Sequence, residues 1–210
     1  MISNIIMEPY FELFLKKEFY PLPIMINFVP YGEHTTEEYK RQLSESNIIV
    51  VLINYEALLS SNFSILCLQQ IDPIITDKIT YLSQKLYADI SSLSPYRPQI
   101  IWFSFEDYCF PQNFTLGCTF IASGLVDNIN LCINEIIKDK VFFIDLKRII
   151  AEIGVFNAYS FKGKYRWNAP YSEVLIETVV KEIHKQYLIG KGKTKKCLDR
   201  KSTRLNSSHT

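Results

Sequence analysis

The stretch Ile48-Ile-Val-Val-Leu-Ile-Asn54 is a continuous aliphatic run of strand length. A strand of this kind has no polar face, so it is typical of a parallel sheet that is covered by helices on both sides. Pro98–Phe105, which reads Pro-Gln-Ile-Ile-Trp-Phe-Ser-Phe, and Val141–Asp145 have the same character. These three stretches predict the central strands of a buried sheet.

Helical patterns alternate with these strands along the chain. Two further strands are expected at residues 23–29 and at residues 3–6, where the start of the first strand is expected to be missing. Helices are expected at residues 9–19, 35–43, 76–91, 125–137, 146–153 and 172–188. Alternation of this kind predicts an α/β fold with three layers, α/β/α, and a mostly parallel, flavodoxin-like sheet of about five strands.

The composition bounds the class of protein. The 210 residues are 48% hydrophobic and 21% charged with a formal net charge of +1, which fits one globular domain. A net charge this close to zero does not indicate the basic surface that nucleic-acid-binding proteins have. No apolar run is long enough to cross a bilayer. The basic run Lys191–Lys196 is expected to be a solvated linker. Five scattered cysteines without metal-ligand spacing, and no signal peptide, indicate a reducing cytoplasm.

The last residues, Asp199–Thr210, have neither a helix nor a strand pattern. A back-translation of them resembles a sequencing adapter, so we expect an artefactual tail and leave it out of fold reasoning. The alternative is a genuine polar tail.

Ligands of parallel α/β sheets bind at the carboxyl ends of the strands, so the residues there are the candidates for function. They are Ser3, Asn4, Pro30–His34, Asn54–Glu56, Glu106–Tyr108 and Asp145, together with the late segment Tyr165–Pro170. From these we take Ser3, His34, Asn54 and Asn168 as candidate catalytic residues. A hydroxyl nucleophile needs a histidine base within hydrogen-bond reach, and His34 is the better placed of the histidines. The alternatives are a solvated loop histidine at position 34 and, for Asp145, either the orientation of a base or a helix cap.

Phosphate loops and metal cages are not indicated. No Walker loop and no Gly-x-Gly-x-x-Gly segment occurs, and the aspartates lack the spacing of a metal cage. The aromatic cluster Tyr159–Trp167 is interleaved with Lys162, Lys164 and Arg166, a combination that suits a nucleotide or a carrier-protein phosphate. Packing of this segment on the sheet edge, or on another domain, is the favoured alternative.

Several segments, taken in order, resemble the N-terminal domain of FkbH-like proteins of the haloacid dehalogenase (HAD) superfamily, subfamily IIIC. The segments are Phe28-Val-Pro-Tyr-Gly-Glu33, Ser46-Asn-Ile-Ile-Val-Val-Leu52, Phe143-Ile-Asp-Leu146, Ile150-Ala-Glu-Ile-Gly154, Trp167-Asn-Ala-Pro-Tyr-Ser172 and Lys195-Lys-Cys-Leu198. The resemblance covers residues 3–198.

The resemblance implies an SGNH-hydrolase-like domain over residues 1–189, ahead of a phosphatase-type HAD domain. Residues 190–198 would then be the linker and the start of that second domain, whose Asp-x-Asp-Asn-Thr motif and Mg²⁺ lie outside this chain. No cofactor or metal is expected in residues 1–198 themselves.

Relatives are implied to transfer a glyceryl or acyl unit from a phosphorylated donor, 1,3-bisphosphoglycerate, to an acyl carrier protein in polyketide or glycan biosynthesis. The late segment Arg166–Tyr171 has no histidine where SGNH hydrolases carry their Asp/His pair. We therefore expect a non-catalytic recognition or scaffold domain from a bacterial, cytoplasmic protein. Its expected partners are the missing HAD domain and an acyl carrier protein. The alternative is a stand-alone SGNH-type esterase or acyltransferase that uses Ser3 with His34.

Overall fold

The structure is a computed structural model of the chain. It describes residues 1–3, 7, 10–54, 73–93, 98–106, 116–137, 140–160, 162–163, 166 and 169–193, with residues 73–75, 116–123 and 125 as backbone only. Asn4, residues 55–63, residues 107–108, Asn168 and residues 194–210, on which several sequence predictions fall, lie outside the described residues.

The sheet has five strands in the order β2-β1-β3-β4-β5, and every neighbouring pair is parallel. The strands are β1 (Ile2–Ser3), β2 (Val29–Pro30), β3 (Ile48–Leu52), β4 (Gln99–Phe103) and β5 (Phe142–Ile144). The predicted parallel α/β sheet is thereby confirmed, with the aliphatic runs at its centre.

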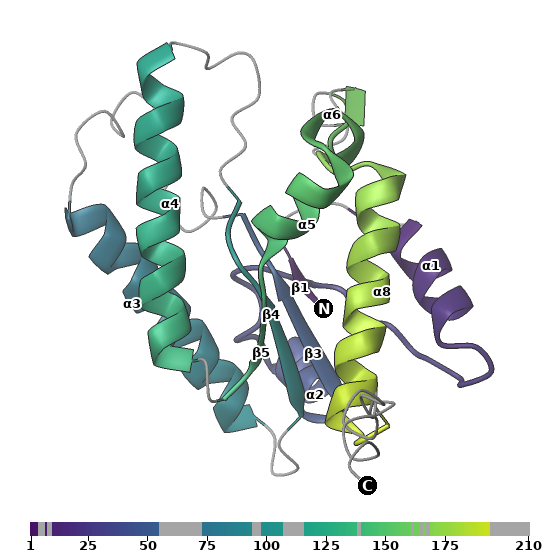
Figure 1. Ribbon diagram of the computed structural model, residues 1–210. Helices are drawn as coiled ribbons and strands as arrows, with labels where there is room; N and C mark the ends of the chain where they lie inside the picture. Colours follow the sequence, from purple (N-terminus) through teal and green to yellow (C-terminus); the bar gives the residue numbers. More distant parts are fainter. Residues whose placement is uncertain are drawn as a thin grey trace, which may run out of the picture.

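Helices cover both faces of this sheet, as Figure 1 shows. The face with α2 (Glu37–Ser44), α3 (Pro73–Leu93) and α4 (Leu116–Ile137) packs on one hydrophobic cluster. The face with α1 (Tyr10–Glu18), α5 (Leu146–Ile153), α6 (Val155–Ala158) and α8 (Glu173–Gly190) packs on the other. The three predicted layers are present.

Strand β3 shows why both faces need a cover. Ile49 and Val51 point into the cluster under α3 and α4, whereas Val50 and Leu52 point into the cluster under α1 and α8. Because side chains alternate along a strand, an all-aliphatic sequence is buried on both sides only in a three-layer fold. Within the described part of the chain, no helix is long and apolar enough to cross a membrane.

Two of three N-cap residues use their side chains to cap the helix that follows. The Ser172 side chain accepts a hydrogen bond from Leu175 N and caps α8, and the Asp145 side chain accepts one from Arg148 N and caps α5. Thr36 is the N-cap residue of α2, but its side chain makes no capping bond there.

Three elements differ from the sequence predictions. Helix α4 begins at Leu116 rather than at residue 125. Gly117 and Gly124 have low helix propensity, so no helix was predicted before residue 125. Helix α6 lies between residues 153 and 172, where no helix was predicted. The strand expected at residues 23–29 is present only as β2, since the neighbouring β1 has just two residues with which it can pair.

Candidate functional site

The carboxyl ends of the parallel strands meet at one edge of the sheet, which is the upper edge in Figure 1. Ser3 ends β1, Asn54 follows β3, Ser104–Glu106 follow β4, and Asp145 follows β5. The structure thus brings polar groups from four strands to one edge, as the sequence predicted.

Glu106 is the buried charge of this edge, with 4% of its surface exposed. Tyr159 donates a hydrogen bond from its phenol to Glu106 Oε2 across 2.8 Å. A buried carboxylate is tolerated only where such donors compensate for lost hydration. Glu106 is therefore held as part of the structure by a residue that lies far from it in sequence.

Tyr171 completes a buried cluster with Tyr159 and Glu106. The two tyrosine rings lie 5.9 Å apart, and their backbones form an antiparallel bridge. Burial raises the pKa of the Tyr171 phenol well above its ordinary value of 10.0, and the Glu106 charge raises that pKa further. The Tyr171 phenol therefore stays protonated under ordinary conditions, and the hydrogen bond of Tyr159 to Glu106 braces the segment before α8.

Ser104 and Asp145 act together at the start of α5. Ser104 is 3% exposed, and its hydroxyl oxygen accepts a hydrogen bond from Leu146 N at 2.9 Å. The Asp145 carboxylate accepts one from Arg148 N at 3.1 Å. Of the two roles left open for Asp145, the structure shows the helix cap.

Asn130 of α4 fixes the chain just after β4. Its side-chain amide accepts from Phe105 N and donates to Phe105 O, both at 2.8 Å. Sequence reasoning missed this residue. Its position in the stripe Val126, Asn130, Ile133, Ile137 is a usable signal, because a polar residue inside a buried helical stripe needs a partner in the core.

His34 lies in the loop after β2 and is 7% exposed, so it is not a solvated loop histidine. Its ring stacks on Tyr31 with centroids 5.9 Å apart, and its Nε2 lies 3.5 Å from Asp89 Oδ2 on α3. His34 Nδ1 and Asp89 Oδ2 are buried without hydrogen-bond partners among the described residues. A cavity of about 170 Å³ separates this loop from α3 beside the pair. Sequence reasoning did not identify Asp89, which lies 55 positions further along the chain.

Ser3 and Asn54 lie on neighbouring strand ends. Ser3 pairs with Pro30 on one side and Leu52 on the other, and its carbonyl accepts a hydrogen bond from Tyr31 N at 3.0 Å. This places the backbone of Ser3 next to the loop that carries His34. A catalytic partnership of Ser3, His34, Asn54 and Asn168 stays a prediction.

The described residues hold no group of three or more His, Cys, Asp or Glu side chains that could bind a metal ion. Asp127, a carboxylate of this edge, already pairs with Lys147 at 2.6 Å. The described residues therefore do not fit Mg²⁺, and no step of a reaction through that ion is derived for this chain.

Comparison with known proteins gives one informative match. The fold is similar to the crystal structure of the N-terminal part of the protein BF1531 from Bacteroides fragilis, which contains a phosphatase domain and is complexed with Mg. The TM-score is 0.62 at 11% sequence identity, over 93% of this chain and 52% of the other. The chain thus spans about half the length of this neighbour, and the likeness shows a shared α/β fold. The chain matches no protein-family model and no curated protein.

Proposed function

We propose that this chain is the N-terminal recognition or scaffold domain of an FkbH-like enzyme of the HAD superfamily, and that it is not catalytic by itself. The observation that carries the proposal is the structural match. Nearly the whole chain aligns with about half of a longer protein whose crystal structure contains a phosphatase domain with Mg. In this proposal residues 1–189 form the platform, residues 190–198 lead into the HAD domain, and residues 199–210 are not part of the fold.

The polar edge supports a platform role. Three side chains of this edge form hydrogen bonds to neighbouring segments. Glu106 accepts one from Tyr159, Asp145 accepts one from Arg148 N, and Asn130 donates one to Phe105 O. A catalytic carboxylate needs access to substrate, which the buried Glu106 lacks. Asp145 is exposed, but its carboxylate caps α5. The proposed chemistry therefore belongs to the HAD domain, with Mg²⁺ as its cofactor.

The proposed reaction of the whole enzyme is transfer of a glyceryl or acyl unit from a phosphorylated donor to an acyl carrier protein. Within it this domain would recognise the carrier or hold the HAD domain in place. The resemblance in residues 3–198 supports this finer assignment.

The first test is to read the coding sequence across the codon for Leu198. We expect the frame to continue into an Asp-x-Asp-Asn-Thr motif. The longer protein should hydrolyse p-nitrophenyl phosphate only with Mg²⁺, and replacement of the first motif aspartate by asparagine should abolish the activity. The 210-residue chain should show none. A genuine stop after Thr210, or a Mg²⁺-dependent phosphatase activity of the 210-residue chain, would contradict the proposal.

A second candidate function is a stand-alone esterase or acyltransferase, and the buried His34–Asp89 pair favours it. An acidic residue beside Nε2 can orient an imidazole whose other nitrogen takes a proton. Hydrolysis of p-nitrophenyl acetate by the 210-residue chain tests this function. Activity that is lost in both Ser3→Ala and His34→Gln, with unchanged circular dichroism, would favour the esterase over the scaffold.

A further inference from the structure

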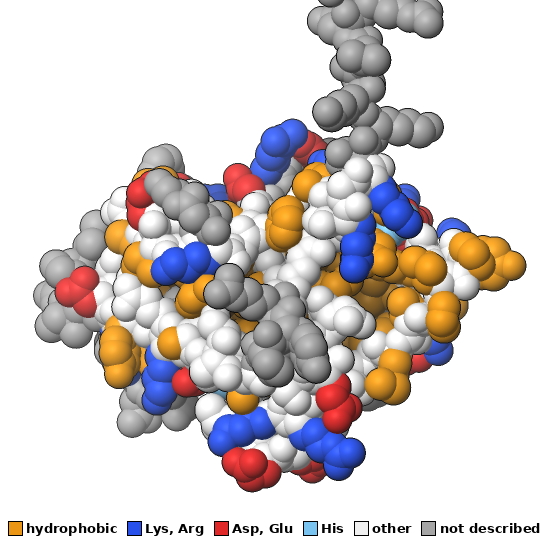
Figure 2. Space-filling model, turned by 90° about the horizontal axis from the view of Figure 1, so that it is seen from below, with side chains coloured by type: hydrophobic (Ala, Val, Ile, Leu, Met, Phe, Trp, Pro, Cys, Tyr) orange, Lys and Arg blue, Asp and Glu red, His pale blue; other side chains and the backbone are white. Residues whose placement is uncertain are grey.

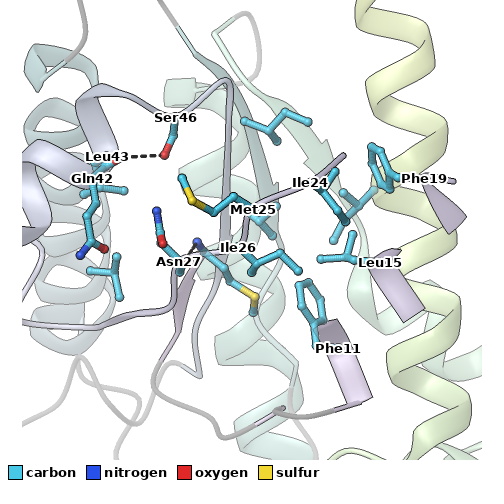
Figure 3. Close-up of a pocket in the computed structure, with 15 residues that line it drawn as sticks. Phe11, Leu15, Phe19, Ile24, Met25, Ile26, Asn27, Gln42, Leu43 and Ser46 are labelled. Atoms are coloured by element: carbon cyan, nitrogen blue, oxygen red, sulfur yellow. Dashed lines mark hydrogen bonds between the residues drawn. The ribbon is translucent and has the colours of Figure 1, made fainter. Parts of the chain in front are cut away.

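A hollow lies in the plane of the sheet at the amino-terminal end of β1. Figure 3 shows it between the segment Ile24–Asn27 and the start of β3, with α1 on one side and α2 on the other. Its volume is about 120 Å³, and the described residues that line it carry no titratable side chain. From below, Figure 2 shows hydrophobic side chains gathered around a hollow on this face. We call this hollow the strand slot.

The segments on the two sides of the strand slot both lack a neighbouring strand there. Strand β1 pairs only with Val51 and Leu52 of β3, so Ile48–Val50 have β4 on one side and no described strand on the other. On the opposite side, residues 24–28 (Ile-Met-Ile-Asn-Phe) are mostly apolar and strand-like, yet the structure assigns no strand there. Both neighbours of the slot thus lack the same partner.

The lining residues come from both faces of the sheet. Gln42, Leu43 and Ser46 belong to the α2 side. On the α1 and α8 side the lining residues are Phe11, Leu15, Phe19 and Ile183. A ligand that lies on a sheet contacts one face, whereas a strand presents alternate side chains to both. The slot therefore has the shape and chemistry of a short piece of strand.

The existing hydrogen bonds define the register of that piece. Met1 N donates to Asn27 O at 2.6 Å, and Val29 N donates to Met1 O at 2.8 Å. Because a parallel ladder repeats every two residues, Asn27 N would donate to the second residue upstream of Met1. That second residue would lie opposite Ile48 and face Phe11 and Phe19. The first upstream residue would face Leu43.

We propose that the strand slot is a binding site for one further stretch of β-strand, formed by polypeptide that continues β1 on the amino-terminal side of Met1. Two apolar residues would fill it, join residues 26–28 to the sheet, and pair the amino-terminal half of β3. The inference does not depend on the proposed function.

A covalent continuation fits the slot better than a separate peptide or ligand. The Met1 ammonium is largely buried, and this burial lowers its pKa from 8.0 to about 6. A peptide bond at this nitrogen keeps the hydrogen bond to Asn27 O and removes the buried charge. A separate peptide would bring its own carboxylate into the same apolar surroundings, at a further cost in desolvation.

The experiment adds Met-Lys-Val-Val before Met1 of the 210-residue chain, with Met-Lys-Gly-Asp as the matched extension. Both remove the ammonium from the slot, but only the first supplies apolar residues with high strand propensity. We expect the Val-Val form to unfold about 5 °C above the Gly-Asp form, a shift that about 2 kcal/mol produces in a domain of this size. Its Asn27 amide should exchange at least about tenfold more slowly, because it gains a ladder hydrogen bond.

Equal unfolding temperatures and an unchanged Asn27 amide in the two extended forms would overturn the proposal. So would protection of Asn27 in the unextended chain that appears only in a dimer, because a second copy would then fill the slot. The same protection produced by the separate peptide acetyl-Lys-Val-Val-amide would also overturn it, since the occupant would not need to be joined to Met1.

Discussion

Tyr159 donates a 2.8 Å hydrogen bond to Glu106, and this bond joins the end of β4 to the segment that precedes α8. The two residues are 53 positions apart and both are buried. Their bond, with the bridge between Tyr159 and Tyr171, fixes the segment before α8 against the end of β4.

Glu106→Ala should lower the free energy of unfolding by about 1–3 kcal/mol, because it leaves the buried Tyr159 hydroxyl without this acceptor. Glu106→Gln should cost less, since an amide oxygen accepts the same bond. Urea unfolding followed by circular dichroism measures both. Glu12→Ala is the control, because Glu12 pairs with Lys16 on the surface and its loss should change stability by less than about 0.5 kcal/mol. If Glu106→Ala were as mild as the control, the bracing role would be wrong.

Asn130→Ala should destabilise the fold by about 2–4 kcal/mol, because both polar groups of the Phe105 backbone lose their bonds to the side chain. Asn128→Ala lies on the exposed side of the same helix and should be near neutral. Hydrogen exchange at the Phe105 amide gives a local readout, since it should accelerate in the first variant only. An unaltered Phe105 amide in Asn130→Ala would contradict the assignment.

Asp145→Ala should cost about 1 kcal/mol through loss of the α5 cap, whereas Asp145→Asn, which keeps a capping oxygen, should cost little. Thermal unfolding of the two variants tests this difference. Glu152→Ala, at the other end of α5, removes an exposed ion pair with Arg148 and serves as the control. A loss in Asp145→Asn equal to that in Asp145→Ala would show that the charge, not the cap, matters.

The Met1 ammonium should make stability rise with pH between about 6 and 8. Its pKa is about 6 in the folded chain against 8.0 in the unfolded chain, so the unfolded state binds more protons in this window. The burial penalty is fully present below pH 6 and is relieved as pH rises, by at most about 3 kcal/mol.

Urea unfolding at pH 6 and pH 8 measures this effect. The form extended by Met-Lys-Val-Val should lack it. The lysine and the new terminal ammonium of the extension lie upstream of the slot, where their pKa values should be the same in the folded and unfolded states, and the remaining titrating groups are common to both proteins. An equal pH dependence in both forms would show that the ammonium is not buried in solution.

Local sequence patterns were sufficient for the sheet but not for its edges. The aliphatic runs in β3 and β4 predicted strands that are buried on both faces, and the helical pattern of residues 172–188 predicted α8. These features depend on residues that are close in sequence. The extent of β2 could not be predicted in the same way, because a strand forms only along the length of its neighbour, here β1.

The candidate site, too, could be predicted only in part from the sequence. The sequence alone placed Ser3, Asn54, Glu106 and Asp145 at the carboxyl ends of strands, because the parallel direction of the strands follows from the alternation of helix and strand patterns. Only the tertiary structure decided what these residues contact. Glu106 meets Tyr159, His34 meets Asp89, and Asn130 meets Phe105 across long stretches of chain. Such pairings depend on how the helices pack on the sheet, and side-chain periodicity within one element carries no information about its partner in another.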